Sequence, residues 1–484
     1  MGRSSVEDPT AAPPRAGTPV GLGRRMKAVL FFAFAFAVMA DPVSSVAYAI
    51  EAPLRSLNGH LDLLLPTMAM VIAIIALVTL NYWQLVGAFP EGGGSPEAAG
   101  TAFGEEWSFL PIGALVVDFA LTIAISIAAA GSALIAYVPS LAPARIPLAL
   151  TLVVLVAGLT WFGHGGRLIF AVMTSLFIVA AAIVLAIGWV DPHASAGRAP
   201  ITGSASPAVL AVMLAFPVGM ALATGTEAPA TSIAQLGQLD GDGRRRFGRG
   251  TLVLTIGIVG TLTLGLTALA VHLNVGIPRP DSTQIADLAH VAVGRGGLYA
   301  FFQLSSSLLL LAAASSSFQA GPGLLKALAR PRHSGEEGLL PPRLARTNRH
   351  HTPVAAVVVY AVISAAIILA AGGHEQELVL VYAVAVFVSF LAGLLAMARF
   401  SSRRGSRLLA LTNILGAVAV SFTLVINLAR GYPLIAIAGT VLVAAVLHWR
   451  WVRAGRPRGV ESIEREAEAD DEPDEPVSAA GRGP

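Results

Sequence analysis

The chain has 484 residues, of which 55% are hydrophobic and only 13% are charged, and its mean hydropathy is +0.72. Soluble globular proteins carry about 25% charged residues, so this composition excludes a soluble fold and predicts an integral membrane protein. The net charge of +3 fits basic membrane loops and indicates no nucleic-acid partner, and the lack of cysteine excludes disulfides and thiolate sites.

The two ends of the chain are the most polar segments. Residues 1–23 and 455–484 are rich in Pro and Gly or in acidic residues and cannot bury enough apolar surface to fold alone, so we expect disordered cytoplasmic tails. Residues 24–454 between them form one transmembrane domain. Basic residues before FFAFAFAVMA imitate a secretory signal peptide, but Asp41 and Pro42 interrupt that pattern.

Apolar runs of about 20 residues, long enough to cross about 30 Å of hydrocarbon, recur about twelve times. We expect spans at 28–56, 61–87, 109–138, 146–163, 168–190, 205–234, 250–274, 298–325, 353–371, 378–399, 405–429 and 433–450. With both termini in the cytoplasm, 26 of the 32 basic residues fall on the cytoplasmic side. The distribution of Lys and Arg therefore predicts a multi-pass protein of a bacterial cytoplasmic membrane, with the lipid bilayer as its surroundings.

Two spans carry helix-breaking sequences. Span 1 contains ADPVSS at residues 40–45, and span 6 contains ATGTEAP at residues 223–229. Irregular backbone at membrane depth is tolerated only where it faces protein or a watery cavity. Breaks that lie five spans apart predict two inverted five-helix halves and a transport site at mid-membrane.

Four acids, Asp41, Glu51, Asp118 and Glu227, lie within the expected spans. An intramembrane acid costs a few kcal/mol and usually serves a function. Because the spans place no Lys or Arg opposite these acids, they favour a cationic ligand. Glu51 is set apart, since it lies close enough to the outer end of span 1 to reach water, and we assign it no role.

Several polar side chains share a helix face with these acids. They are Asp41, Ser45 and Tyr48 on span 1, Phe119, Thr122 and Ser126 beside Asp118 on span 3, Thr224, Thr226 and Glu227 at the break of span 6, and Tyr382 in span 10. Carboxylate, hydroxyl and carbonyl oxygens are the ligands that replace water around an alkali cation. We expect Ser45, Thr226 and Phe119 to line the same site. The alternative is packing, because membrane Ser and Thr often bond only to their own helix.

Enzyme motifs are missing from the sequence. The ten histidines fall in loops or at span ends, and neither H-E-x-x-H nor G-x-x-x-x-G-K-[ST] occurs. We therefore expect no enzyme activity and no cofactor.

The stretch DPVSSVAYAIE at 41–51 resembles the D-x-x-S-S-V-x-Y-x-x-E motif of APC superfamily transporters, in the branch of the KimA and KUP potassium–proton symporters. Further similar stretches are AFPEGGGS (88–95), the run 116–131, ATGTEA (223–228), SSSFQAGPGLLKALA (315–329) and LVYAVAVFVSF (380–390). This resemblance covers the first ten spans in order. It implies an all-α LeuT-like fold, a 5+5 inverted repeat with spans 1 and 6 broken around the substrate and two extra helices behind.

The resemblance also implies roles for individual residues. It places potassium at Asp41, Tyr48, Thr122, Ser126, Thr224 and Tyr382, and proton coupling at Glu227 with Asp118 as the family's acid in span 3. Phe119 departs from the family, which has tyrosine there, and this removes one hydroxyl. Related proteins continue into a cytoplasmic domain that mediates dimers, whereas this sequence has a short acidic tail, so a homodimer is left open.

The expected function is therefore proton-coupled import of potassium or a similar monovalent cation. One alternative is an amino-acid or organic-solute permease of the same superfamily, which fits the changed residue Phe119. Such permeases usually place a Gly-rich segment at the break of span 1, where Asp41 and Pro42 would repel a carboxylate and withhold a donor. A second alternative is a non-transporting membrane sensor, which would need a signalling domain that the sequence does not contain.

Overall fold

The computed structural model describes residues 24–162, 167–194, 207–331, 338–431 and 434–469. Within these ranges the chain folds into helices and short 3-10 turns, with no strand. The expected tail at 1–23 and the end of the chain, 470–484, lie outside the described residues.

The helices occupy all twelve expected spans. Span 1 comprises α1 (Arg24–Val38), α2 (Ala40–Ser44), α3 (Val46–Ala49) and α4 (Glu51–Ser56), and span 6 comprises α10 (Ala208–Gly219), η3 (Met220–Ala223), α11 (Ala228–Thr231) and η4 (Ser232–Gln235). The other spans are α5 (Leu61–Ala88), α7 (Phe109–Tyr137), α8 (Arg145–Trp161), α9 (Arg167–Val190), α12 (Gly241–His272), α14 (Gly297–Ala329), α15 (Val354–Ala370), α16 (Glu375–Arg403), α17 (Arg407–Ala429) and α18 (Leu434–Arg453). Ten segments of the described chain are long and apolar enough to cross a membrane, the bent span 1 makes an eleventh, and α15 is a shorter apolar helix of 17 residues.

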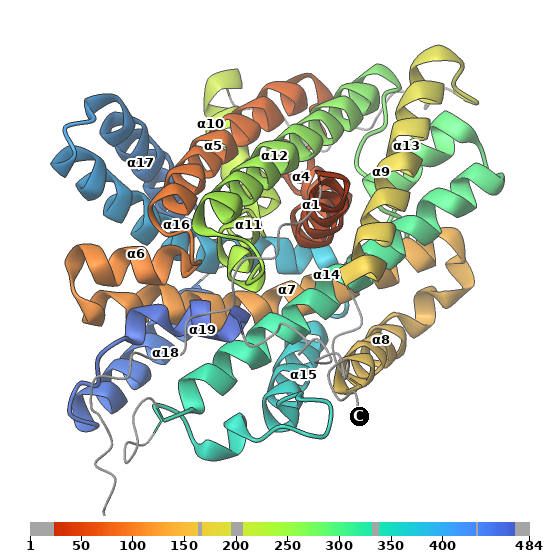
Figure 1. The fold of residues 1–484 in the computed structure, drawn as a ribbon. Helices are drawn as coiled ribbons and strands as arrows, with labels where there is room; N and C mark the ends of the chain where they lie inside the picture. The colour runs from red at the N-terminus through yellow and green to blue at the C-terminus, as the bar shows by residue number, and fades with distance from the viewer. Residues whose placement is uncertain (1–23, 163–166, 195–206, 332–337, 432–433, 470–484) are drawn as a thin grey trace, which may run out of the picture.

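The core of the bundle surrounds α7. This helix packs against α14, α16 and α18, and 83% of its apolar window is buried (Figure 1). By contrast, only 33% of the apolar window of α17 and 28% of that of α18 are buried. Apolar side chains on these outer helices are available to contact lipid, whereas the residues that could form a site lie on the inner ones.

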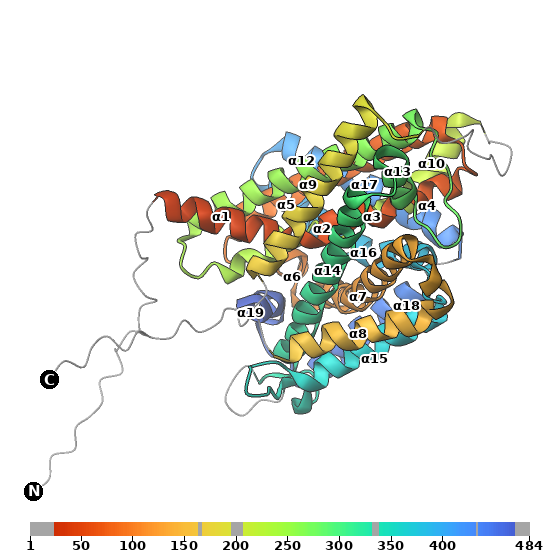
Figure 2. The same cartoon turned by 90° about the vertical axis from the view of Figure 1, so that its right-hand side faces the viewer.

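Short helices cover the two ends of the bundle (Figure 2). One end, here called the terminal face, carries the start of α1, α6 (Gly94–Phe103), η1 (Glu105–Ser108), η5 (Pro342–Ala345), η6 (Val460–Ser462) and α19 (Ile463–Ala469). The other end, the opposite face, carries α4, η2 (Pro139–Ala144) and α13 (Gln284–Val293). Consecutive spans therefore run in alternating directions between the two faces.

Both expected helix breaks are present. Span 1 bends by 49° between Val38 and Ala40 and is interrupted again at Ser45 and Ile50. Span 6 opens into a turn over residues 224–227, between η3 and α11, in which Gly225 has φ +71°. The two broken spans lie five spans apart, as the Pro and Gly residues predict for two inverted halves.

The C-terminal segment, residues 455–469, departs from the expected disorder. It forms η6 and α19, and Val460, Ile463 and Ala467 are buried. These apolar residues recur at helical spacing and place one apolar face against the bundle, while the acidic composition hides this pattern. The expectation of a wholly disordered tail over 455–484 is therefore corrected for its first fifteen residues.

Candidate functional site

The two helix breaks contact each other in the middle of the bundle. A Cβ atom on Gly225 would lie 2.8 Å from Oδ2 of Asp41, so the carboxylate occupies the space that the missing side chain leaves. The Ser45 hydroxyl lies 2.7 Å from the carbonyl of Pro42 and 3.2 Å from that of Leu222, and it can donate to either. Glycine is required at position 225 both by its positive φ and by this close approach.

Hydroxyl groups from four spans gather at the same level. Thr122 on α7 and Tyr382 on α16 form a hydrogen bond of 2.8 Å between Oγ1 and Oη. The Tyr48 hydroxyl on α3 lies beside Thr224, outside hydrogen-bonding geometry to any described residue. Ser126, one helical turn beyond Thr122, is fully buried, and its Oγ also lacks a partner among the described residues.

Three carboxyls lie in the same region. Asp118 and Glu227 are buried, Asp41 is partly buried, and each acts electrostatically on at least one of the others. Among the described residues, no basic side chain contributes to the charge environment of these three acids. One oxygen of each, Asp41 Oδ1, Asp118 Oδ1 and Glu227 Oε2, has no hydrogen-bond partner there. Such oxygens suit a cation or a proton as partner.

The remaining predicted residues differ in what their side chains do. Thr224 and Thr226 donate to carbonyls of their own segment, those of Ala221 and Ala223, at 2.8 and 2.6 Å. These two hydroxyls therefore bond to their own segment, as membrane Ser and Thr often do, and these bonds stabilise the open turn. Phe119 is half-buried on α7 and packs against the apolar core.

Two polar residues near Glu227 were not predicted from the sequence. The hydroxyls of Tyr82 on α5 and Ser95 on α6 lie 3.0 Å apart, and Tyr82 is within electrostatic reach of Glu227. Ser95 follows a run of three glycines, Gly92 to Gly94, whose composition is typical of a flexible loop. Instead, Gly92 has φ +98°, and its Cβ would lie 2.9 Å from that of Ala234, so the run allows close packing against span 6. A single Tyr in an apolar span and a Ser in a loop form no pattern from which a site could be predicted.

Glu51 lies outside this centre, because it starts α4, which lies at the opposite face (Figure 2). Its Oε1 forms an ion pair with Arg55 Nη2 at 2.7 Å, and its Oε2 accepts a hydrogen bond of 3.0 Å from the backbone N–H of Gln284. Gln284 is the first residue of α13, where free N–H groups and the helix dipole favour a carboxylate. Glu51 therefore attaches α13 to the outer part of span 1.

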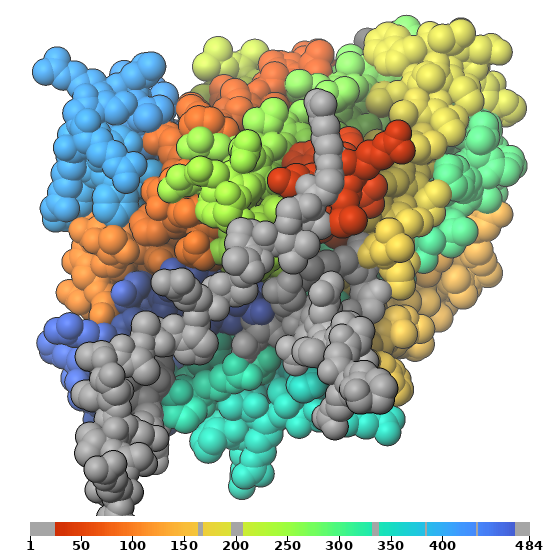
Figure 3. Space-filling model, in the orientation of Figure 1, coloured from red at the N-terminus to blue at the C-terminus, as the bar shows by residue number. Residues whose placement is uncertain are grey.

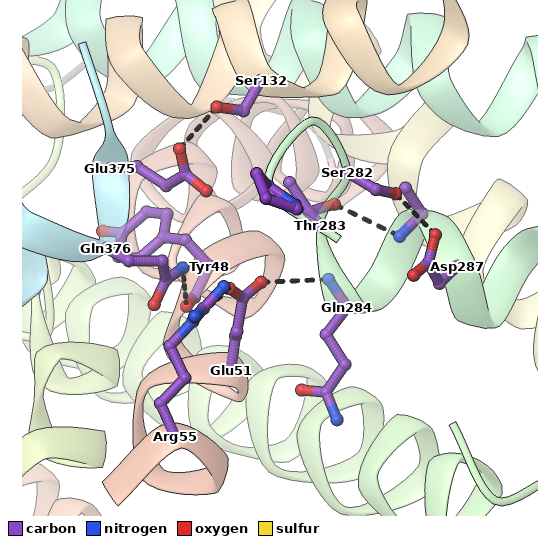
Figure 4. Close-up of polar contacts among 12 residues, drawn as sticks. Tyr48, Glu51, Arg55, Ser132, Ser282, Thr283, Gln284, Asp287, Glu375 and Gln376 are labelled. Carbon is purple, nitrogen blue, oxygen red and sulfur yellow. Dashed lines mark hydrogen bonds and ion pairs between the residues drawn. The ribbon is translucent and has the colours of Figure 1, made fainter. Parts of the chain in front are cut away.

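A cavity of about 610 Å³ opens beside Glu51. Glu375 and Gln376, at the start of α16, line it and join neighbouring elements: Ser132 donates to Glu375 at 2.5 Å, and Gln376 donates to the backbone carbonyl of Tyr48 at 3.2 Å (Figure 4). Arg145 donates to Ser132 at 2.7 Å. The cavity thus extends from the opposite face toward the segment that carries Tyr48.

Comparisons with known proteins agree with this architecture. The family model described as amino acid permease matches residues 30–451. The potassium transporter KimA of Bacillus subtilis (strain 168) is 28% identical over 306 residues, which cover 60% of this chain and 49% of that protein. The match thus spans about half the length of this curated relative.

Solved structures support the fold alone. Two mutants of the manganese transporter of Eremococcus coleocola superpose with a TM-score of 0.50 at 14% identity, covering 91% of this chain and 98% of theirs. This likeness confirms the LeuT-like APC fold. The substrate has to be inferred from the residues of the site.

Proposed function

Because this chain belongs to the amino acid permease family of the APC superfamily and is a secondary transporter, not an enzyme, we propose that it imports potassium or a similar monovalent cation together with a proton. One observation carries this proposal. Three carboxyls and several hydroxyls converge at the two helix breaks, and no basic side chain among the described residues balances them. Such a site attracts a cation and repels an anion.

The orientation of the protein in the membrane is part of the proposal. Most of the basic loop residues lie on the terminal face, which we assign to the cytoplasm of a bacterium. The cavity beside Glu51 then opens to the outside and provides the entry route. A cation that enters there meets Tyr48 next, because Gln376 on the cavity wall bonds to the Tyr48 carbonyl.

The proposed cation ligands come from both breaks and from two unbroken helices. They are Asp41, Tyr48, Thr122, Ser126, Thr224 and Tyr382. Asp41 provides the negative charge, and the hydroxyls replace part of the hydration shell. Phe119 lies one position after Asp118 and offers no oxygen, so the ligand set depends on the other hydroxyls.

The proton is assigned to Glu227, with Asp118 as its electrostatic partner. Glu227 is buried, has an unpaired oxygen and is acted on by Asp41, so the charge at one acid affects the protonation of the other. Binding of a cation at Asp41 would thereby be coupled to the proton at Glu227. Rocking of spans 1, 2, 6 and 7 against the remaining spans then exposes both to the cytoplasm.

Rubidium uptake into proteoliposomes tests this function. Liposomes without internal potassium are scored for uptake of the ion with and without an inward proton gradient. We expect gradient-dependent uptake by the natural sequence and none by Asp41→Asn. The matched control is Asp62→Asn, because the Asp62 side chain is 75% exposed at the opposite face. Uptake by Asp41→Asn at the natural rate would refute the assignment of Asp41.

A second candidate is an amino-acid or organic-solute permease. It is favoured by the description of the family model and by Phe119, which offers an apolar surface where an ion needs oxygen. Accumulation of amino acids without rubidium flux would establish this candidate. Absence of flux for both substrate classes would instead favour the sensor alternative.

A further inference from the structure

We propose that the C-terminal segment, residues 455–469, is an intramolecular lock that closes the transport route at the terminal face and must detach before substrate can pass. This inference rests on the proposed function, because it assigns a form of regulation to the same site. Three features of the segment support this role. They are its position at the terminal face, its close contact with α6, and its attachment to both span 6 and α14, which transport would move apart.

The segment is held firmly at its start. Beyond α18, the Trp451 indole N–H donates to the carbonyl of Pro457 at 2.8 Å, and the N–H of Arg456 donates to the carbonyl of Trp451 at 2.9 Å. Gly459 adopts φ +87° and starts η6. This sharp turn directs the chain back under the bundle, where it lies between α6 and the helices around α14 (Figure 3).

The contact with α6 uses glycines that allow close approach. A Cβ on Gly94 would lie 2.7 Å from Oε2 of Glu464, and one on Gly100 would lie 2.6 Å from Cβ of Glu461. Between them, Arg465 Nη1 forms an ion pair with Glu97 Oε1 at 2.9 Å. The two segments are therefore closely packed, and a larger side chain at Gly100 would meet the Cβ of Glu461.

The segment also joins the two parts that alternate access must separate. Gln235 at the end of span 6 donates to Glu468 at 2.5 Å, and α19 packs against α11 and η4 of that span. The same short helix packs against α14, which is span 8. Span 6 belongs to the proposed rocking group and α14 to the remainder. While α19 is docked on both, their terminal ends are held together.

Its location places it between the site and the terminal face. Glu464 is buried to 6% exposure and lies within electrostatic reach of Glu227, the acid proposed to carry the proton. Tyr82, beside Glu227, is acted on by Glu464 as well. In this proposal, a substrate that leaves the centre toward the terminal face has to pass the docked segment.

Two readouts test the lock, and one of them does not depend on the substrate. The chain has no cysteine, so a single introduced cysteine reports local access. Thr231→Cys reports on this contact, because Thr231 is 5% exposed and ends α11, which packs against α19. Its reaction with a membrane-impermeant maleimide supplied from the terminal face is measured alongside rubidium flux.

Ile463→Arg is the variant that detaches the segment, because Ile463 is 1% exposed and cannot bury a charge there. We expect labelling of Thr231→Cys and rubidium flux each to rise about tenfold, within the usual range of a coupling between two states. Ala469→Arg, at an exposed position of the same helix, is the matched control and should leave both unchanged.

A charge swap tests the same contact from both sides. Arg465→Glu sets a second carboxylate against Glu97 in place of the ion pair. It should raise both rubidium flux and Thr231→Cys labelling, and Glu97→Arg in the same chain should lower both again. Increased labelling by Ile463→Arg without rubidium flux in any variant would support the lock and refute the cation assignment. Unchanged labelling with both Ile463→Arg and Arg465→Glu would overturn the lock.

Discussion

The acids at the centre of the bundle and Glu51 at the opposite face differ in how their carboxyl oxygens are hydrogen-bonded. In the centre, polar atoms of Asp41, Tyr48, Asp118, Ser126 and Glu227 lack partners among the described residues. At the opposite face, both oxygens of Glu51 are bound, by Arg55 and by the N–H of Gln284. A buried unpaired polar group costs about 1–3 kcal/mol. The acids of the centre therefore gain from a ligand. Both oxygens of Glu51 are satisfied without one, although the side-chain oxygens of Gln284 and Gln376 beside it have no partner among the described residues.

The largest expected effect is at the contact between the two breaks. Gly225→Ala should reduce rubidium uptake more than about 100-fold, because alanine disfavours φ +71° and its Cβ would lie 2.8 Å from the Asp41 carboxylate. The same substitution at Gly158, whose Cβ would meet no atom within 4 Å, should leave uptake unchanged. Rubidium uptake is measured for both variants. Uptake by Gly225→Ala at the natural rate would show that transport does not need the close contact between the two helix breaks.

A smaller effect should separate a ligand hydroxyl from a structural one. Tyr382→Phe removes a hydroxyl that bonds to Thr122 in the centre, and we expect the KM for rubidium to rise about tenfold with a small change in kcat. Tyr360→Phe is the matched control, because Tyr360 donates to the carbonyl of Val116 at 3.2 Å. It should lower the melting temperature and leave KM unchanged. Equal changes in KM for the two variants would remove Tyr382 from the site.

The Glu51 network should respond through stability more than through transport. Glu51→Gln keeps an acceptor for Gln284 but replaces the ion pair with Arg55 by a neutral contact, which should cost about 1 kcal/mol. We expect a lower melting temperature and uptake within about twofold of the natural rate. Glu106→Gln, at an exposed residue, is the control. Loss of uptake without loss of stability would place Glu51 among the transport residues.

The sequence was informative wherever the signal was local. Pro42, Gly225 and Pro229 predict the two breaks because each disrupts regular helix geometry nearby. The spacing of Asp41 and Tyr48, and the position of Thr122, likewise depend on single helices. The burial and mutual arrangement of these residues follow from the fold, but their role as cation ligands stays a prediction.

The features that the sequence did not predict depend on contacts between residues that are distant in the chain. Glu51 binds a backbone N–H that lies 233 residues away, and Gln235 binds Glu468 across the same number. Ser95 gains its neighbour Tyr82 only when α6 folds back on α5. Composition also misled at the C-terminus, where three buried apolar residues outweigh many acidic ones. Such pairings leave no periodic pattern in a single sequence.

The acids at the contact between the C-terminal segment and α6 are intermediate between those of the centre and Glu51 in how many of their oxygens are paired. Glu97 pairs one oxygen with Arg465 and leaves the other unpaired, and Glu464 also has an unpaired oxygen. Burial raises the pKa of Glu97 to about 7, with Arg465 opposing and Glu461 adding to the rise, and burial also raises the pKa of Glu464. Besides each other, the charged groups that act on these two are Glu91, Glu227, Glu461, Arg465, Glu466 and Glu468.

A raised pKa in the docked state means that docking is favoured by protonation. The contribution is complete below the ordinary pKa of glutamate, near 4.5, and is lost as the pH rises through about 7. Labelling of Thr231→Cys, normalised to Trp107→Cys at an exposed position, should therefore be about threefold faster at pH 8 than at pH 6. In the Ile463→Arg background this ratio should be close to one, because the segment is already detached. If the centre alone responded to pH, both backgrounds would show the same ratio.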